Sequence, residues 1–137
     1  MTTTYIDANV LIAAARATDE LAERALSYLD DPQRSFVSSA FVRLEVLPKP
    51  IYLQRRDEAA FYTTFFSAVT AWGPITTKLI EHADQLASTY GLSALDAIHV
   101  ASALALQAEE LITAERHEKP IHRVRDLRVI SIASRRA

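Results

Sequence analysis

Short apolar runs alternate along the chain with longer segments whose apolar residues recur every three or four positions. The short runs are rich in β-branched and aromatic residues and predict strands, whereas the longer periodic segments predict helices. The predicted strands cover residues 3–6, 35–38, 68–72, 111–113 and 128–132. The predicted helices cover residues 10–15, 18–29, 40–47, 52–66, 77–90 and 93–108. Residues 114–127 are polar and irregular, so we expect a loop there.

Several residues mark where the predicted helices begin and end. Asn9 and Ser39 are favoured N-caps for the helices at 10–15 and 40–47, and Gly91 suits the position after a helix. Pro48 and Pro50 are expected to end the helix that precedes them. For residues 68–71, continuation of the preceding helix is the alternative to a strand.

The regular alternation of strands and helices predicts an α/β fold with a five-stranded, mostly parallel sheet and helices on both faces. A chain of 137 residues suffices for one such domain. We expect the domain to span residues 1–133 and residues 134–137 to form a short C-terminal tail.

Composition narrows the class of protein. The chain has no cysteine, which excludes disulfides and thiolate metal sites and fits a reducing compartment such as the cytoplasm. No apolar run nears the about 20 residues of a membrane span, and the N-terminus does not resemble a signal peptide. The net charge of −2 gives no global field that attracts nucleic acid, so such a partner would need a local basic patch.

Two acids follow predicted strands. Asp7 ends the first strand, and ligands of open α/β sheets bind outside the carboxyl ends of the strands. Capping of the next helix is the alternative role for Asp7, although Asn9 can fill it. Glu115 stands two residues past Thr113, so we expect it at the same sheet edge; a solvated loop acid is the alternative.

A third acid lies on an unusually apolar helix. Between residues 94 and 106 the only polar residues are Asp96, His99 and Ser102, so this helix should be buried. Ser93 and Asp96 also fit a capping box, which gives Asp96 an alternative role. His99 is either a ligand or base, or a hydrogen-bonded core residue that orients Asp96.

The fourth acid is Glu45. Helical spacing places it on the same face as Phe41, which should pack inward, and a glutamate there is costly unless it is paired, protonated or bound to a metal. The alternative is an exposed acid that pairs with Arg43 or Lys49.

Four carboxylates that converge in a small cleft cannot all stay ionised without a cation. Oxygen ligands favour hard ions, so the pattern implies Mg²⁺ or Mn²⁺. Such a site suits phosphodiester cleavage, because the ion acidifies water and neutralises charge on the phosphate.

Three blocks of sequence resemble the PIN-domain ribonucleases, and in order and spacing most of all the small VapC toxins of toxin–antitoxin pairs. The blocks are residues 5–12 (YIDANVLI), 41–46 (FVRLEV) and 92–103 (LSALDAIHVASA). The resemblance covers nearly the whole chain. It implies an α/β/α sandwich with a parallel five-stranded sheet and a Mg²⁺- or Mn²⁺-dependent endoribonuclease.

The resemblance also assigns roles to residues. Asp7, Glu45 and Asp96 match the three principal acids of the family. The fourth acid is usually an Asp or Asn in a Thr-x-Asp motif, whereas here Glu115 follows Thr113 with its longer side chain. Glu115 is therefore expected to act through water or at a second, weaker ion.

Further residues are expected to support or surround the acids. Supporting roles fall to residues that flank them: Asn9, Ser39, His99 and Thr113. Cations near Glu45 and Glu115 are candidates for contacts with RNA phosphates, namely Arg43, Lys49, Arg116 and Arg123.

The resemblance implies two kinds of protein partner. One is a small antitoxin that covers the acids, and the apolar stretch 51–66 is a candidate wall of its groove; core packing is the alternative for that stretch. The other partner is a second copy of the chain in a homodimer.

Two other functions compete with RNA cleavage. The first is a catalytically inactive PIN-like binding module, in which Glu115 reflects a lost site. The second is a phosphatase or phosphotransfer domain on a similar sheet, although Asn9 stands where a dehalogenase-type phosphatase needs a second acid.

Overall fold

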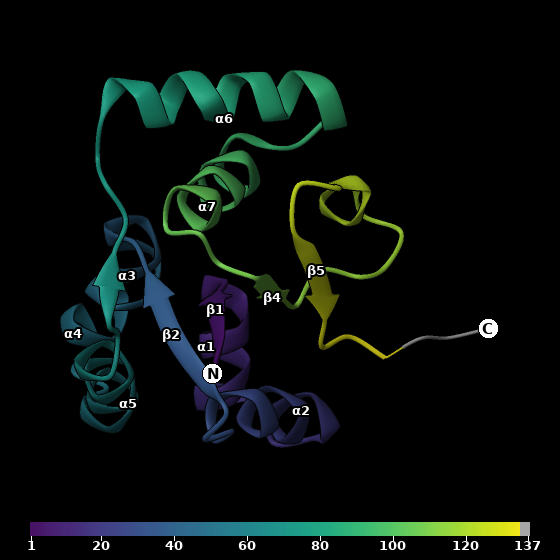
Figure 1. The fold of residues 1–137 in the computed structure, drawn as a ribbon. Helices are drawn as coiled ribbons and strands as arrows, with labels where there is room; N and C mark the ends of the chain where they lie inside the picture. Colours follow the sequence, from purple (N-terminus) through teal and green to yellow (C-terminus); the bar gives the residue numbers. More distant parts are fainter. Residues whose placement is uncertain (135–137) are drawn as a thin grey trace.

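A five-stranded parallel sheet runs through the molecule (Figure 1). The computed structural model describes residues 1–134 and orders the strands β3-β2-β1-β4-β5. The strands are β1 (Thr2–Ile6), β2 (Arg34–Ser38), β3 (Ala71–Trp72), β4 (Glu110–Thr113) and β5 (Arg128–Ser131). All four pairings are parallel, as the sequence pattern predicts.

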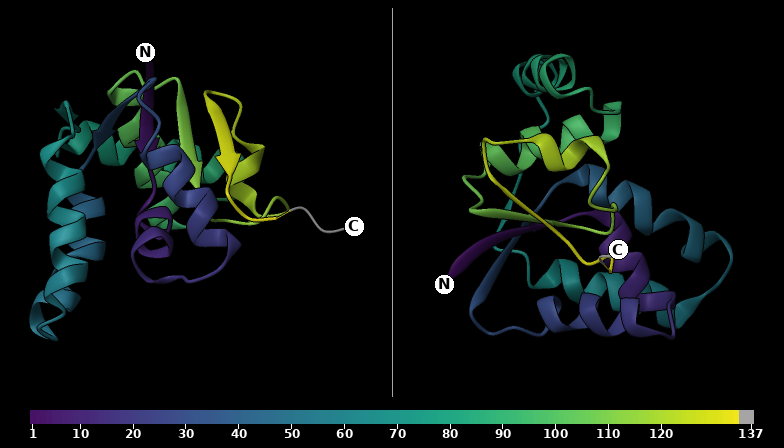
Figure 2. Two further views of the ribbon diagram at one scale, coloured as in Figure 1. Left: turned by 90° about the horizontal axis from the view of Figure 1, so that it is seen from below. Right: turned by 90° about the vertical axis from the view of Figure 1, so that its right-hand side faces the viewer.

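Helices cover both faces of this sheet. They are α1 (Ala8–Arg16), α2 (Glu20–Leu29), α3 (Ala40–Val46), α4 (Pro48–Tyr52), α5 (Arg56–Ser67), α6 (Thr77–Tyr90) and α7 (Ala94–Ala105), with a 3₁₀ helix η1 at Pro120–Arg123. Figures 1 and 2 show α6 and α7 on one side of the sheet and α1, α2 and α5 on the other. The predicted α/β architecture is confirmed.

The register places the ends of β1 and β4 side by side. Ile6 pairs with Ile112, and the amide of Asp7 donates to the carbonyl of Ile112 at 3.0 Å. The strand order reverses between β1 and β4, because the helices that follow β1 and those that precede β4 cover opposite faces. Ligands of open α/β sheets bind at such a switch point, beyond the carboxyl ends of the strands.

The core lies where the central strands meet the apolar faces of α1 and α7. Tyr5 and Ile6 of β1 and Leu111 of β4 are fully buried, as are Leu11 of α1 and Val100 of α7. Burial on both faces explains why two large apolar or aromatic residues follow each other directly in each central strand, Tyr5-Ile6 in β1 and Leu111-Ile112 in β4. This packing fixes the positions of the residues that follow the strands.

The region after α3 differs from the predicted single helix at 52–66. The prolines begin a new short helix, α4, because the first helical turn needs no N–H partners from Pro48 and Pro50. Residues 53–55 then separate α4 from α5, and Gln54 adopts a left-handed conformation with φ of 57°. The expectation of one long helix was therefore wrong.

Three smaller expectations also change. Asn9 does not cap a helix at residue 10, because α1 begins at Ala8 and Asp7 occupies the N-cap position. The predicted strand at 68–72 is reduced to β3, since Ala68 ends α5. The loop at 114–127 contains η1, whose Ile121 is fully buried.

The C-terminal part of the domain extends slightly beyond β5. The amide of Ile132 donates to the carbonyl of Thr113 at 2.9 Å, and Ile132 is buried. Most of the predicted tail, residues 135–137, lies outside the described residues, so the boundary at 133 stays a prediction. Within residues 1–134 no helix combines the length and apolar character needed to cross a membrane.

Candidate active site

Asp7 lies at the carboxyl end of β1 with only 4% of its surface exposed. Its side chain makes no capping hydrogen bond to the described residues of α1. Instead, Oδ2 accepts a hydrogen bond of 2.9 Å from the hydroxyl of Thr113, at the end of β4. The side chain of Asp7 therefore does not cap α1 and instead contacts Thr113 across the sheet edge.

Thr113 also links Asp7 to Glu115. The fully buried Thr113 hydroxyl accepts a hydrogen bond of 3.1 Å from the amide of Glu115 while it donates to Asp7. The Glu115 carbonyl accepts hydrogen bonds from Nε2 of His122 at 2.9 Å and from the hydroxyl of Ser131 at 2.7 Å. The backbone of Glu115 is therefore held on both sides, next to the end of β4.

Asp96 lies in the first turn of α7, where the Ser93 hydroxyl caps the helix by accepting from the Asp96 amide at 3.3 Å. Burial raises the pKa of Asp96, and the negative charges of Asp7 and Glu115 raise it further. The cap is thus formed by Ser93. The negative charges of Asp7 and Glu115 at the sheet edge therefore act on the Asp96 carboxylate.

His99 is almost completely buried, one helical turn after Asp96. Its Nε2 lies 2.5 Å from Oε1 of Glu45 and 3.8 Å from Oδ1 of Asp7. Since a carboxylate only accepts, Nε2 carries the proton of the bond to Glu45. The expectation that His99 orients Asp96 was wrong, because its hydrogen bond goes to Glu45.

Tyr5 completes this buried network. Its hydroxyl lies 2.8 Å from Nδ1 of His99 and 2.7 Å from the hydroxyl of Ser39, the N-cap residue of α3. Burial raises the pKa of Tyr5, so the phenol stays protonated. The sequence pattern did not single out Tyr5, although a tyrosine in a buried strand needs a polar partner and could have been recognised by that rule.

Burial and the groups that neighbour His99 and Asp7 shift the pKa values of these two residues in opposite directions. Burial alone would lower the pKa of His99, but the bond to Glu45 and the charges of Asp7 and Asp96 raise it overall. Burial raises the pKa of Asp7, which His99 and the Thr113 hydrogen bond offset only in part. Asp7 and Asp96 are thus both held above their ordinary pKa by lost hydration and by neighbouring acids.

Glu45 lies on α3 with its side chain 29% exposed. Among residues 1–134 it forms no ion pair with Arg43 or Lys49, the partners considered from the sequence; its partner is His99. This contact spans 54 positions of the chain, which local spacing does not reveal.

The donor set fits a hard divalent cation. All four candidate ligands are carboxylates, and burial together with neighbouring acids raises the pKa of both Asp7 and Asp96, whose negative charge a cation would offset. In the described part of the chain, no group of three or more His, Asp or Glu side chains is arranged to hold a metal ion. The fit therefore rests on donor chemistry and on charge.

The residue Asn9, predicted to support the site, and the four cations predicted to contact RNA lie in different surroundings. Asn9 and Arg43 are exposed on α1 and α3. Lys49 lines a small cleft that also contains Glu45. Arg116 pairs with Glu118 at 3.0 Å, and Arg123 donates to the carbonyl of Tyr90 at 3.2 Å, which ties η1 to the end of α6.

Comparison with a family of known domains gives a match over most of the chain. The profile of the PIN domain matches residues 4–127. No curated protein sequence shows a significant match.

Several solved structures share the fold. A toxin–antitoxin complex from Klebsiella pneumoniae has a TM-score of 0.71 at 20% identity, over 94% of this chain and 97% of that one. VapBC-1 from nontypeable Haemophilus influenzae has a TM-score of 0.66 at 22% identity, over 96% and 98%. A VapC toxin of Mycobacterium tuberculosis that cleaves the sarcin–ricin loop has a TM-score of 0.60 at 19% identity, over 79% and 86%. At these identities the likeness establishes the fold.

Proposed function

The chain belongs to the PIN domain family, and from this membership we propose that it is a Mg²⁺- or Mn²⁺-dependent endoribonuclease. The observation that carries the proposal is the pair Asp7 and Asp96. Both have a raised pKa at the switch point of the sheet, and each lies in the field of another acid. A divalent cation compensates such charge, and phosphodiester hydrolysis uses one.

Asp7 and Asp96 would hold the ion, and Glu45 and Glu115 would complete its surroundings. When bound, the ion supplies acidification of water and neutralisation of phosphate charge. The Thr113 hydroxyl fixes Oδ2 of Asp7, so that the carboxylate keeps one orientation. Glu45 would accept the proton of the attacking water. Glu115 would support a second position at which a metal ion binds more weakly.

His99 and Tyr5 position Glu45 for that role. Tyr5 connects Ser39 to Nδ1 of His99, and Nε2 of His99 holds one oxygen of Glu45. A rigid general base is more effective, because a proton acceptor must lie within hydrogen-bond reach of the water. The network thus holds a partly exposed carboxylate at a defined place.

We also propose a toxin role in the cytoplasm, a small antitoxin as partner, and a homodimer. Structures of similar fold are toxin–antitoxin complexes. The apolar stretch proposed for the antitoxin groove divides in two: Tyr62, Phe65 and Phe66 are core residues, whereas Ile51 and Tyr52 are 58% and 85% exposed. The exposed part, on α4, is the part available for a partner.

One observation favours the inactive binding module as a second candidate. The N–H of His99 already bonds Glu45 and lies 3.8 Å from Asp7, so the protein itself offsets part of the negative charge at the site. For a phosphotransfer domain no comparable support exists, since the exposed Asn9 stands where the second acid is needed.

The test incubates the purified protein, free of any antitoxin, with total RNA and Mn²⁺. We expect discrete cleavage that disappears with EDTA and in the Asp7→Ala variant. Cleavage that survives both controls would identify a contaminating nuclease. An absence of cleavage across many RNAs would favour the binding module.

A further inference from the structure

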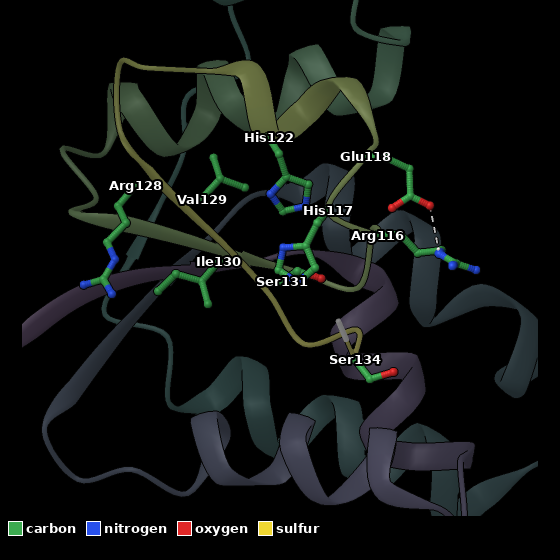
Figure 3. Close-up of a pocket in the computed structure, with 9 residues that line it drawn as sticks. All are labelled: Arg116, His117, Glu118, His122, Arg128, Val129, Ile130, Ser131 and Ser134. Atoms are coloured by element: carbon green, nitrogen blue, oxygen red, sulfur yellow. Dashed lines mark ion pairs between the residues drawn. The ribbon is translucent and has the colours of Figure 1, made fainter. Parts of the chain in front are cut away.

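A hollow of about 700 Å³ lies beside Glu115, between the segment 116–122 and the edge strand β5 (Figure 3). Its lining includes Arg116, His117, His122, Arg128, Ile130 and Ser131. We call it the β5 hollow. It has the size of common small-molecule sites, and none of the four proposed ligands lines it.

Positive charge dominates the lining of the β5 hollow. Arg128 forms no ion pair with any residue of the described range 1–134, whereas Arg116 is partly neutralised by Glu118. Among residues 1–134, Glu118 is the one acid that lines the hollow. Figure 3 shows Arg128 at one end, the Arg116–Glu118 pair at the other, and two imidazoles between them. An anionic group is therefore favoured at the Arg128 end.

The imidazoles provide flat surfaces in the middle of the hollow. The rings of His117 and His122 lie 5.4 Å apart with an angle of 30° between their planes. His122 is fixed in place, because its Nε2–H donates to the Glu115 carbonyl. Val129 and Ile130 add apolar lining. Aromatic faces bind nucleobases by stacking, with little dependence on sequence.

We propose that the β5 hollow binds one nucleotide of a single-stranded RNA, with its phosphate at Arg128 and its base against His117. Arginine suits a phosphate because its planar fork donates two hydrogen bonds at once. A cation beside stacking surfaces is the combination that single-stranded nucleic acids require.

The position of the hollow connects this nucleotide to the acids. His122 and Ser131 of the lining both donate to the Glu115 carbonyl, and the Glu115 amide donates to Thr113, the partner of Asp7. The hollow therefore adjoins the sheet edge where the acids lie, and an RNA strand seated in it would continue toward them. The inference rests on the proposed function, and it adds a subsite next to the cleavage centre.

The experiment measures binding without cleavage. A fluorescently labelled single-stranded RNA of about ten nucleotides is titrated with the full chain in EDTA, and anisotropy gives the Kd. Arg128→Ala is compared with Arg125→Ala, which removes the same charge from an exposed arginine that does not line the hollow. Thermal unfolding verifies that both variants are folded.

We expect Arg128→Ala to weaken binding about tenfold and Arg125→Ala to leave it within about twofold, as the loss of a solvated charge-assisted contact with one phosphate predicts. The slope of log Kd against log salt should fall by about 0.7 in Arg128→Ala alone. His117→Ala should weaken binding about fivefold or more, whereas His117→Phe should retain it by stacking.

Equal effects of Arg128→Ala and Arg125→Ala, with wild-type binding intact, would overturn the subsite and leave the proposed function standing. If the wild-type chain binds no RNA in EDTA, the subsite fails, and the cleavage assay with Mn²⁺ decides the proposed function separately. Displacement of the RNA by inorganic phosphate as effectively as by a nucleoside monophosphate would show a general anion site and overturn the nucleotide assignment.

Discussion

Asp96 shows how acids that lie close together reduce the stability of the fold. Its pKa is raised by burial and by the charges of Asp7 and Glu115, so the folded state holds an ionised Asp96 unfavourably at neutral pH. The Asp96→Asn variant keeps the shape and removes the charge. In EDTA we expect it to raise the free energy of unfolding by on the order of 1 kcal/mol, the scale of one contact between like charges that solvent screens, since Asp96 is half-buried.

Chemical denaturation of both proteins in EDTA measures this difference. Asp84→Asn is the matched control, since Asp84 is exposed on α6, and its effect should stay within about 0.5 kcal/mol. A destabilised Asp96→Asn variant would mean that the ionised side chain contributes favourably to the start of α7, against the charge argument.

The pKa of His99 links stability to pH. It is raised above 6.5 despite burial, by Glu45, Asp7 and Asp96. The protonated ring then stabilises the fold fully below pH 6.5, and this contribution is lost as pH rises through the folded-state pKa. The raised pKa values of Asp7 and Asp96 act in the same direction, because stability falls as pH rises from 3.8 through their folded-state values.

His99→Gln separates the two contributions. Glutamine retains an N–H donor and does not titrate, so the part of the loss of stability above pH 6.5 that comes from His99 should disappear, while the loss that Asp7 and Asp96 cause above pH 3.8 remains. Urea unfolding in EDTA at a series of pH values measures both. An unchanged profile above pH 6.5 in His99→Gln would contradict the role of the His99 charge.

The junction of α4 and α5 shows what local patterns capture. The apolar residues at 61–66 correctly predict a helix there, but they do not reveal that Pro48 and Pro50 start a separate helix. Proline fits both the end of a helix and the first turn of the next, so its presence alone does not decide. The structure resolves this choice by a left-handed residue, Gln54, between the two helices.

The φ of 57° at Gln54 carries a strain that glycine avoids. We expect Gln54→Gly to raise the free energy of unfolding by about 0.5 kcal/mol, after subtraction of the entropy that glycine adds to the unfolded chain. Denaturant unfolding measures the change. Gln85→Gly, within α6, should instead cost about 1 kcal/mol, and equal losses in both variants would contradict the conformation at residue 54.

Sequence patterns predicted most of the whole-molecule architecture. The alternation of strands and helices gave the parallel sheet, and the acids after strands pointed to its carboxyl edge; the family resemblance is confirmed by the match over residues 4–127. The Glu45–His99 contact and the β5 hollow were not predictable, because both depend on side chains from distant parts of the chain. The roles of the four acids stay predictions.

At the scale of the molecule, the central claim is that Asp7 and Asp96 share a divalent cation at the switch point between β1 and β4. The fold supports the claim by bringing a strand end and a helix start into one electrostatic field, which the shifts in pKa express. Oxygen ligands make Mn²⁺ a suitable probe of this position.

The most direct test is a calorimetric titration of Mn²⁺ into the wild-type chain, Asp96→Asn and the control Asp84→Asn. We predict measurable binding to the wild type and to Asp84→Asn, and none to Asp96→Asn, because the amide loses the negative charge that attracts the ion without changing the shape of the site. Unchanged Mn²⁺ affinity in a folded Asp96→Asn variant would contradict the claim.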